Sequence, residues 1–160
     1  AWPLIKDRVL MLYQGCLSIG FHPKCFRHAV LAIIKKPNKT DQTHPHSYRP
    51  IALLSVLGKG LERLVARNMA WLAVHHKVLN SQQFGALPLC SATDLTTCLT
   101  HDVEQALNQG KTATLLTLDV KGAFDTVLPG RLVHQLRSQG WPHHLTHWVT
   151  SFATGHSVQI

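Results

Sequence analysis

The sequence lacks any apolar run near the roughly 18 residues that a membrane-spanning helix requires. Its N-terminus also lacks the basic-then-apolar layout of a secretory signal peptide. No membrane partner is therefore expected. Four cysteines are present (Cys16, Cys25, Cys90 and Cys98), and none shows the Cys-x-x-Cys spacing of a zinc finger or a redox motif. We therefore expect free thiols and a reducing, intracellular compartment.

An initiating methionine is also missing, and the final residues, Val158 to Ile160, have the composition of an unfinished strand. Both features predict a fragment of a longer protein. With 160 residues and 45% hydrophobic content, the chain can bury one core or part of a larger one. The sequence contains no internal repeat, low-complexity tract or flexible linker.

Acidic residues are scarce, since 8 Asp and Glu oppose 16 Lys and Arg, and the formal charge is +8. Most of the excess lies between Lys24 and Arg67, where only Asp41 and Glu62 oppose the basic side chains. A concentrated basic face attracts nucleic-acid backbone or nucleoside triphosphate. A solvated surface that aids solubility is the alternative. The basic residues of this window are Lys24, Arg27, Lys35, Lys36, Lys39, Arg49, Lys59, Arg63 and Arg67.

Hydrophobic periodicity and capping signals predict an α+β fold in which helices separate a few short strands. Ser91 and Asp94 have the spacing of a capping box, and Gly20 and Gly110 are expected to end the helices that precede them. Three prolines make residues 37–50 a predicted polar loop. Helices are expected over 3–19, 55–76, 92–108, 130–139 and 142–155, and strands over 29–34 and 112–118.

The most informative segment is Leu118-Asp-Val-Lys-Gly-Ala-Phe-Asp-Thr-Val, which follows the predicted buried strand 112–118. Asp119 is expected at the strand's exit, and a second carboxylate, Asp125, follows six residues later. A carboxylate in this position suits a hard divalent cation that neutralises phosphate charge. The alternative is that Asp119 only caps the next turn and Asp125 is solvated.

Four further segments accompany this one in a fixed order: Ile33-Ile-Lys-Lys-Pro, Ser47-Tyr-Arg-Pro-Ile through Leu-Gly-Lys-Gly-Leu-Glu, Gln83-Phe-Gly-Ala, and Ser91-Ala-Thr-Asp. With them, nearly the whole chain resembles the reverse transcriptase of non-LTR (LINE-type) retrotransposons. The resemblance implies a partial polymerase right hand, with fingers and connecting helices over about 1–110 and the start of the palm over about 111–160. It also implies a nuclear location, an RNA template, a DNA primer and deoxynucleoside triphosphates (dNTPs).

The resemblance assigns catalytic roles to the segment around Asp119. Asp119 matches the first of three carboxylates that hold two Mg²⁺ ions, and the carbonyl of Val120 is expected to help coordinate the second ion. Phe124 matches a steric gate that excludes the 2′-hydroxyl of a ribonucleotide, although a Phe beside a strand end is commonly a core residue. Asp125 belongs to the motif without being a ligand and ranks lower.

The resemblance also assigns substrate contacts. Lys35, Lys36 and Arg49 match fingers positions that contact the incoming triphosphate, for which the planar fork of Arg is well suited. Gln83, Phe84 and Gly85 are expected on the template side, with Gly85 allowing close approach of the backbone. Arg63 and Arg67, four residues apart on the helix predicted over 55–76, rank lower.

One family motif is absent: no aromatic-x-Asp-Asp segment occurs before Ile160. We therefore expect no polymerisation by this chain alone. Leu89 and Cys90 stand where relatives more often have Gly-Arg, and His156 stands where they usually have Arg. Two other interpretations stay open, a catalytically dead nucleic-acid-binding remnant and an unrelated α/β phosphotransfer domain with a Mg²⁺ site at Asp119. His143 and His147 have zinc-compatible spacing, but without a third ligand they are interpreted as surface residues.

Overall fold

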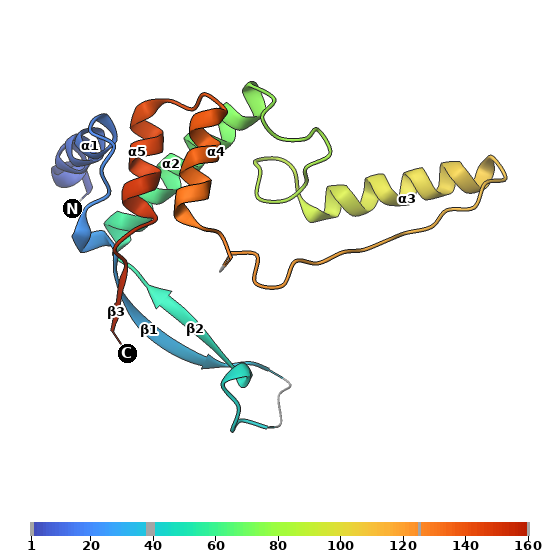
Figure 1. The fold of residues 1–160 in the computed structure, drawn as a ribbon, viewed down its shortest axis with the longest axis horizontal. Coiled ribbons are helices and arrows are strands. Elements are labelled where there is room, and N and C mark those ends of the chain that lie inside the picture. The colour runs from blue at the N-terminus through green and yellow to red at the C-terminus, as the bar shows by residue number, and fades with distance from the viewer. Residues whose placement is uncertain (1, 38–40, 125, 160) are drawn as a thin grey trace. The chain divides into compact units, whose positions relative to one another are not determined.

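The computed structural model describes residues 2–37, 41–124 and 126–159, and it divides into two compact units (Figure 1). Unit 1 comprises Ala1–Val65 and Val127–Ile160, and unit 2 comprises Ala66–Thr126. The described residues form five α-helices and one three-stranded sheet. The predicted α+β class is confirmed.

The sheet of unit 1 has the strand order β2-β1-β3 (Figure 1). Its central strand, β1 (His28–Lys35), pairs antiparallel with β2 (Tyr48–Leu53) and parallel with β3 (Ser157–Gln159). The strand expected over 29–34 and the strand-like C-terminus are confirmed. The loop expected to reach residue 50 is shorter, because β2 begins at Tyr48. Pro50 is tolerated there because β2 is an edge strand, where one side needs no ladder hydrogen bonds.

The helices of unit 1 bury the core beside this sheet. They are α1 (Trp2–Ser18), the first part of α2 (Val56–His75), α4 (Pro129–Ser138) and α5 (His143–Phe152). Leu61 of α2 and Leu145 of α5 are almost completely buried, and Trp148 stacks on Phe152 with ring centroids 5.1 Å apart. Figure 1 shows α4 and α5 side by side. The apolar periodicity of these segments therefore marks the faces that pack.

Gly20 ends α1 as predicted and sets how closely that helix end approaches α5. Its φ is +66°, a conformation that glycine adopts without the steric penalty of a side chain. A Cβ atom added at Gly20 would lie 2.5 Å from the Cβ of His147 and 2.8 Å from the carbonyl oxygen of His144. A glycine is therefore required here both for the turn and for helix packing.

Unit 2 contains the end of α2, a loop, and α3 (Ala92–Asn108), which is marked in Figure 1. The predicted capping box is present. The hydroxyl of Ser91 accepts from the backbone N–H of Asp94 at 3.2 Å, and the Asp94 carboxylate accepts from the backbone N–H of Ser91 at 2.7 Å. Hydrogen bonds from Ser91 hold the pKa of Asp94 below its usual value. The N-terminus of α3 is therefore fixed by its own sequence.

The strand predicted over 112–118 does not form. Residues 111–120 have no regular secondary structure, and every one of them is exposed. A β-strand needs a neighbour for its backbone N–H and C=O groups, and no described residue pairs with this segment. The composition of 112–118 indicates strand propensity, but propensity without a partner leaves the segment extended and solvated.

Two further features concern the helices and the cysteines. Among the described residues, no helix is both long and apolar enough to cross a membrane. All four cysteines are free thiols, with Cys16 buried and Cys25 exposed.

Candidate catalytic and nucleic-acid-binding residues

The β1–β2 hairpin brings together the three basic residues predicted to contact triphosphate. Arg49 lies opposite Ile34, and Lys35 lies opposite Tyr48. Because paired residues share a face and side chains alternate along a strand, Arg49 and Lys35 lie on opposite faces of the hairpin. Lys36 follows the end of β1 directly. Lys35 and Arg49 are exposed and Lys36 is half-buried. The hairpin therefore carries a cation on each face, with a third at the end of β1.

Lys36 is positioned by the short helical turn η2 (Pro45–Ser47) that precedes β2. Its ammonium group donates to the carbonyl oxygen of His46 at 2.7 Å, and its backbone N–H donates to the carbonyl of Ser47 at 2.8 Å. The buried Ser47 hydroxyl donates to the carbonyl of Asp41 at 2.5 Å. These bonds place Lys36 against the turn, so it is held more firmly than an ordinary surface lysine.

Arg27 is part of the basic window of the sequence, but it is not part of a basic surface. Only 7% of it is exposed. Its guanidinium donates to the His22 carbonyl through Nε at 3.0 Å and through Nη2, to the Ser151 hydroxyl at 2.8 Å and to the Thr154 carbonyl at 3.1 Å. Arg27 is thus a structural residue that joins the segment before β1 to the end of α5. Lys39, another member of the basic window, lies outside the described residues.

A buried polar cluster that the sequence did not predict lies beside Arg27. His22 is fully buried, and its Nε2 lies 3.7 Å from Oε1 of Glu62 on α2. Within the described part of the chain, neither ring nitrogen of His22 has a hydrogen-bond partner, nor does Trp148 Nε1. Burial lowers the pKa of His22 to about 4, with Arg27 and His156 acting in the same direction. Burial also raises the pKa of Glu62. Because the pKa of His22 is about 4, its imidazole is neutral at pH 7 and the two side chains do not form an ion pair there.

We predict that unit 1 loses stability as the pH falls through the range set by His22. Its folded pKa of about 4 lies below the ordinary 6.5, so the unfolded chain binds a proton between these values. The free energy of unfolding should fall by about 2 kcal/mol from pH 7 to pH 5, partly opposed by the raised pKa of Glu62. Urea unfolding at both pH values measures this. His22→Leu should reduce the dependence of the free energy of unfolding on pH, whereas His134→Asn, at an exposed site, should not. Equal pH responses for the parent chain and both variants would contradict the prediction.

Asp119 and its neighbours lie in the exposed segment of unit 2. Val120 is 69% exposed and Phe124 is 95% exposed. The interpretation of Phe124 as a core residue is therefore wrong for the described structure, and its ring is presented to solvent. A turn follows, in which the backbone N–H of Thr126 donates to the Gly122 carbonyl at 3.0 Å. Asp125 lies outside the described residues.

The donors at this segment suit magnesium only in part. The Asp119 carboxylate and the Val120 carbonyl are hard oxygen donors of the kind that Mg²⁺ prefers, and both residues are exposed. Mg²⁺ requires six ligands in octahedral geometry. Among the described residues, no group of three or more His, Cys, Asp or Glu side chains could hold a metal ion. The segment can supply two ligands, and the described chain does not complete the set.

The predicted template residues form a tight loop in unit 2. The backbone N–H of Gly85 donates to the Cys90 carbonyl at 2.9 Å, and Gly85 has a φ of +75°. No atom lies within 4 Å of a Cβ added there, so the backbone conformation rather than crowding selects glycine. Gln83 is exposed and Phe84 is half-buried. The three predicted residues therefore lie together in one compact loop.

The remaining site predictions fall on helices. Arg63 lies on the part of α2 in unit 1, and Arg67 on the part in unit 2; both are exposed. His143 and His147 are exposed on α5, with ring centroids 6.2 Å apart in an edge-on arrangement.

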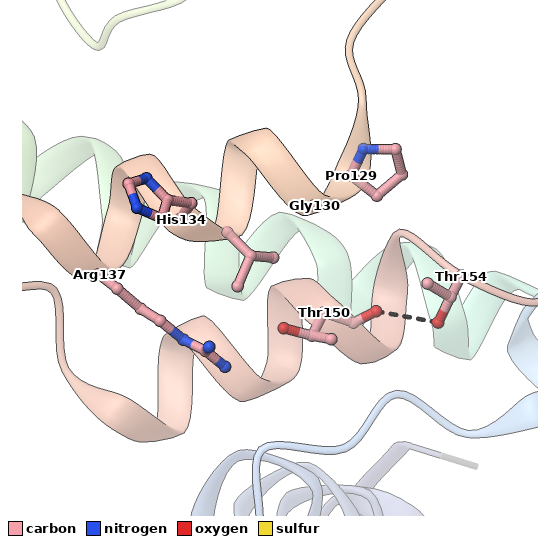
Figure 2. A pocket seen from close by; sticks show the side chains of 7 residues that line it. Pro129, Gly130, His134, Arg137, Thr150 and Thr154 are labelled. Carbon is pink, nitrogen blue, oxygen red and sulfur yellow. Dashed lines mark hydrogen bonds between the residues drawn. The ribbon is translucent and has the colours of Figure 1, made fainter.

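A groove between α4 and α5 was not anticipated from the sequence (Figure 2). Its volume is about 420 Å³, and Figure 2 shows His134 and Arg137 of α4, together with Thr150 of α5 and Thr154, among the residues that line it. Both threonine hydroxyls donate to carbonyls one turn earlier, at 2.8 and 3.0 Å, so their protons are already used. The groove therefore offers few donors to an anion beyond its two basic side chains.

Comparison with known proteins identifies the family. Residues 34–159 match the model of the reverse transcriptase (RNA-dependent DNA polymerase) family. A probable RNA-directed DNA polymerase from transposon BS of Drosophila melanogaster is 32% identical over 79% of this chain. The polymerases of the mobile element jockey are 30% identical over 81% in D. melanogaster and 27% identical over 98% in Drosophila funebris.

The matched region spans only 14 to 17% of the length of these three relatives. The match covers the end of β1, all of β2 and the segment of Asp119. The chain belongs to the reverse transcriptase (RNA-dependent DNA polymerase) family, in the group carried by non-LTR retrotransposons.

Proposed function

We propose that this chain is the fingers and the first part of the palm of an RNA-directed DNA polymerase. The complete enzyme adds dNTPs to the 3′ end of a DNA primer on an RNA template. The family match over residues 34–159 carries this proposal, because it includes both the hairpin cations and Asp119. The relatives named above are RNA-directed DNA polymerases by name.

In this proposal the hairpin contacts phosphate. Arg49 lies on one face of the hairpin and Lys36 directly follows β1, so both cations are available to phosphate groups at this end of the hairpin. The guanidinium of Arg49 can grip two phosphate oxygens, whereas the Lys36 ammonium acts as a point charge. Lys35, on the opposite face, is left to contact another part of the nucleic acid. The template loop of Gln83, Phe84 and Gly85 keeps its predicted role.

Asp119 is the first catalytic carboxylate in this proposal, and Val120 contributes its carbonyl. When bound, the two Mg²⁺ ions activate the primer 3′-oxygen and stabilise the leaving pyrophosphate. Phe124, whose ring is exposed beside this segment, supplies the steric gate that selects deoxyribose.

The chain by itself should not polymerise, because its sequence contains no adjacent pair of aspartates to complete the metal site. We predict no primer extension by the 160 residues alone. We predict measurable extension once they are joined to the downstream part of a relative's polymerase that carries the aromatic-x-Asp-Asp motif. Extension of a labelled DNA primer on an RNA template, with Mg²⁺ and dNTPs, is the measurement. Extension by the 160-residue chain alone would refute the role given to the missing motif.

A second candidate function is supported by the basic surface: binding of single-stranded nucleic acid without catalysis. Lys24, Lys35, Arg49, Lys59 and Arg63 are all exposed in unit 1. The net charge of +8 favours a polyanionic partner. This function needs no metal site and is compatible with a catalytically dead remnant.

The 160-residue chain should bind single-stranded RNA with strong salt dependence. Removing one phosphate contact by Arg49→Ala should weaken binding roughly five-fold at 0.1 M salt and lower the slope of log K against log salt by about 0.7. Fluorescence anisotropy of a labelled 12-nucleotide RNA at several salt concentrations measures both quantities. Arg8→Ala, at an exposed arginine on α1, is the charge-matched control and should leave both nearly unchanged. Equal effects of the two substitutions would mean that the hairpin has no special role.

A further inference from the structure

Three side chains on the part of α2 in unit 2 form a line along one helix face. Arg67, Trp71 and His75 are spaced four residues apart, so they lie one above another on the helix surface. All three are exposed, and Trp71 is 59% exposed. The buried Ala73 and the half-buried Leu72 mark the side of α2 that packs in this region. We call these three residues the α2 stripe.

The two aromatic rings of the α2 stripe are stacked. The indole of Trp71 and the imidazole of His75 have centroids 4.7 Å apart and an interplanar angle of 9°. His76 meets His75 edge-on, with centroids 5.0 Å apart. Trp71 is thus oriented in a defined way although it is largely exposed. A large exposed aromatic side chain away from the packed face adds little to a core, which makes a binding role worth testing.

The charge around the stacked pair favours an anionic ligand. Arg67 lies one turn before Trp71 on α2, and His75 lies one turn after it. Glu62 is the only acidic residue of α2. It is placed beside His22 in the polar cluster of unit 1 and not on the α2 stripe. A base that stacked on Trp71 would bring its own phosphate towards the Arg67 guanidinium.

We propose that the α2 stripe binds one unpaired nucleotide of single-stranded RNA. The base extends the Trp71–His75 stack on the Arg67 side of the indole, and Arg67 binds the adjacent phosphate. Stacking on an aromatic ring tolerates any base, because every base has a π face. Duplex RNA cannot use this site, because its bases are already stacked on one another. The inference rests on the proposed nucleic-acid-binding function and adds a base-stacking subsite to it.

The test uses the 160-residue chain, a fluorescein-labelled 12-nucleotide single-stranded RNA, and the same RNA annealed to its complement. Trp71→Ala should weaken binding of the single strand about ten-fold and leave the salt slope unchanged, since no phosphate contact is lost. Trp71→Phe, which keeps a ring, should recover most of the affinity. Arg67→Ala should weaken binding roughly five-fold and lower the salt slope by about 0.7. Duplex binding should respond to Arg67→Ala alone or to neither substitution.

Trp2→Ala is the matched control, because Trp2 is 62% exposed on the helix α1 of unit 1. If Trp71→Ala and Trp2→Ala both bind like the parent chain while Arg49→Ala weakens binding, the α2 stripe is refuted and the proposed function stands. If the parent chain binds no single-stranded RNA, both the α2 stripe and the proposed nucleic-acid-binding function are refuted. If Trp71→Ala weakened binding of the duplex as much as binding of the single strand, base stacking at Trp71 would also be refuted. Should Trp71→Ala lose helicity by circular dichroism, Trp71→Phe and the salt slope of Arg67→Ala decide the outcome.

Discussion

Asp119→Asn should lower the rate of primer extension at least about 1,000-fold, equivalent to about 4 kcal/mol of transition-state stabilisation. The measurement needs the joined protein described above, since the 160-residue chain is not expected to extend a primer. Asparagine keeps the size of aspartate but removes the negative charge that a divalent cation requires. Because Asp119 lies in an exposed segment without regular structure, the substitution should change the free energy of unfolding by less than about 0.5 kcal/mol.

Two controls make this result specific to catalysis. Asp102→Asn removes the same charge from an exposed position on α3, and it should extend the primer at the parent rate. Asp119→Asn should also keep the parent's affinity for single-stranded RNA, since this segment is not among the basic contacts. Extension by Asp119→Asn within ten-fold of the parent would overturn the assignment of Asp119 as the first catalytic carboxylate.

Arg27→Met should destabilise the chain by about 3 kcal/mol. The substitution removes the guanidinium donors to the carbonyls of His22 and Thr154 and to the Ser151 hydroxyl, at a site that is 7% exposed. The His22 carbonyl keeps only the Ser151 hydroxyl at 3.4 Å. Buried polar groups that lose a charged partner carry the full desolvation penalty. The measurement is urea unfolding of the 160-residue chain at pH 7.

The same substitution should also loosen β3. The backbone carbonyl of Arg27 accepts from the N–H of Ser157 at 3.2 Å, directly before the parallel pairing of β1 with β3 begins. Amide hydrogen exchange of Val158 should therefore accelerate in Arg27→Met. Arg131→Met, at an exposed arginine on α4, is the matched control and should change stability by less than about 0.5 kcal/mol. A loss below 1 kcal/mol in Arg27→Met would show that the buried charge costs as much as its hydrogen bonds contribute.

The elements that could be predicted are those whose signals are local. The Ser91–Asp94 capping box, the stop at Gly20 and the apolar stripe of α2 each depend on residues within a turn or two of each other. These interactions form in the same way wherever the helix lies. The strand over 112–118 was predicted by equally clear composition and was wrong, because a strand is completed by a distant partner. β2 was missed for the converse reason: its pairing with β1 overrides the local signal of Pro50.

The candidate site divides in the same way. Motif order alone pointed to Asp119, Arg49 and the reverse transcriptase family, and the family assignment is confirmed. The individual residue roles stay predictions. Sequence position placed Arg27 among the phosphate-binding cations, yet the fold buries it. A cation's surroundings depend on which segments pack over it, and residues 151 to 154 lie far along the chain from residue 27.

By itself, then, the sequence determined the helices, the α+β class, the family and the absence of a complete acidic motif. Each of these depends only on neighbouring residues or on the order of motifs along the chain. Only the tertiary structure decided that Arg27 and His22 are internal, that Lys35 and Arg49 lie on opposite faces of the hairpin, and that Trp71 stacks on His75. It also decided that the segment before Asp119 stays unpaired. Burial, register and pairing arise from contacts between distant parts of the chain, and no local pattern specifies them.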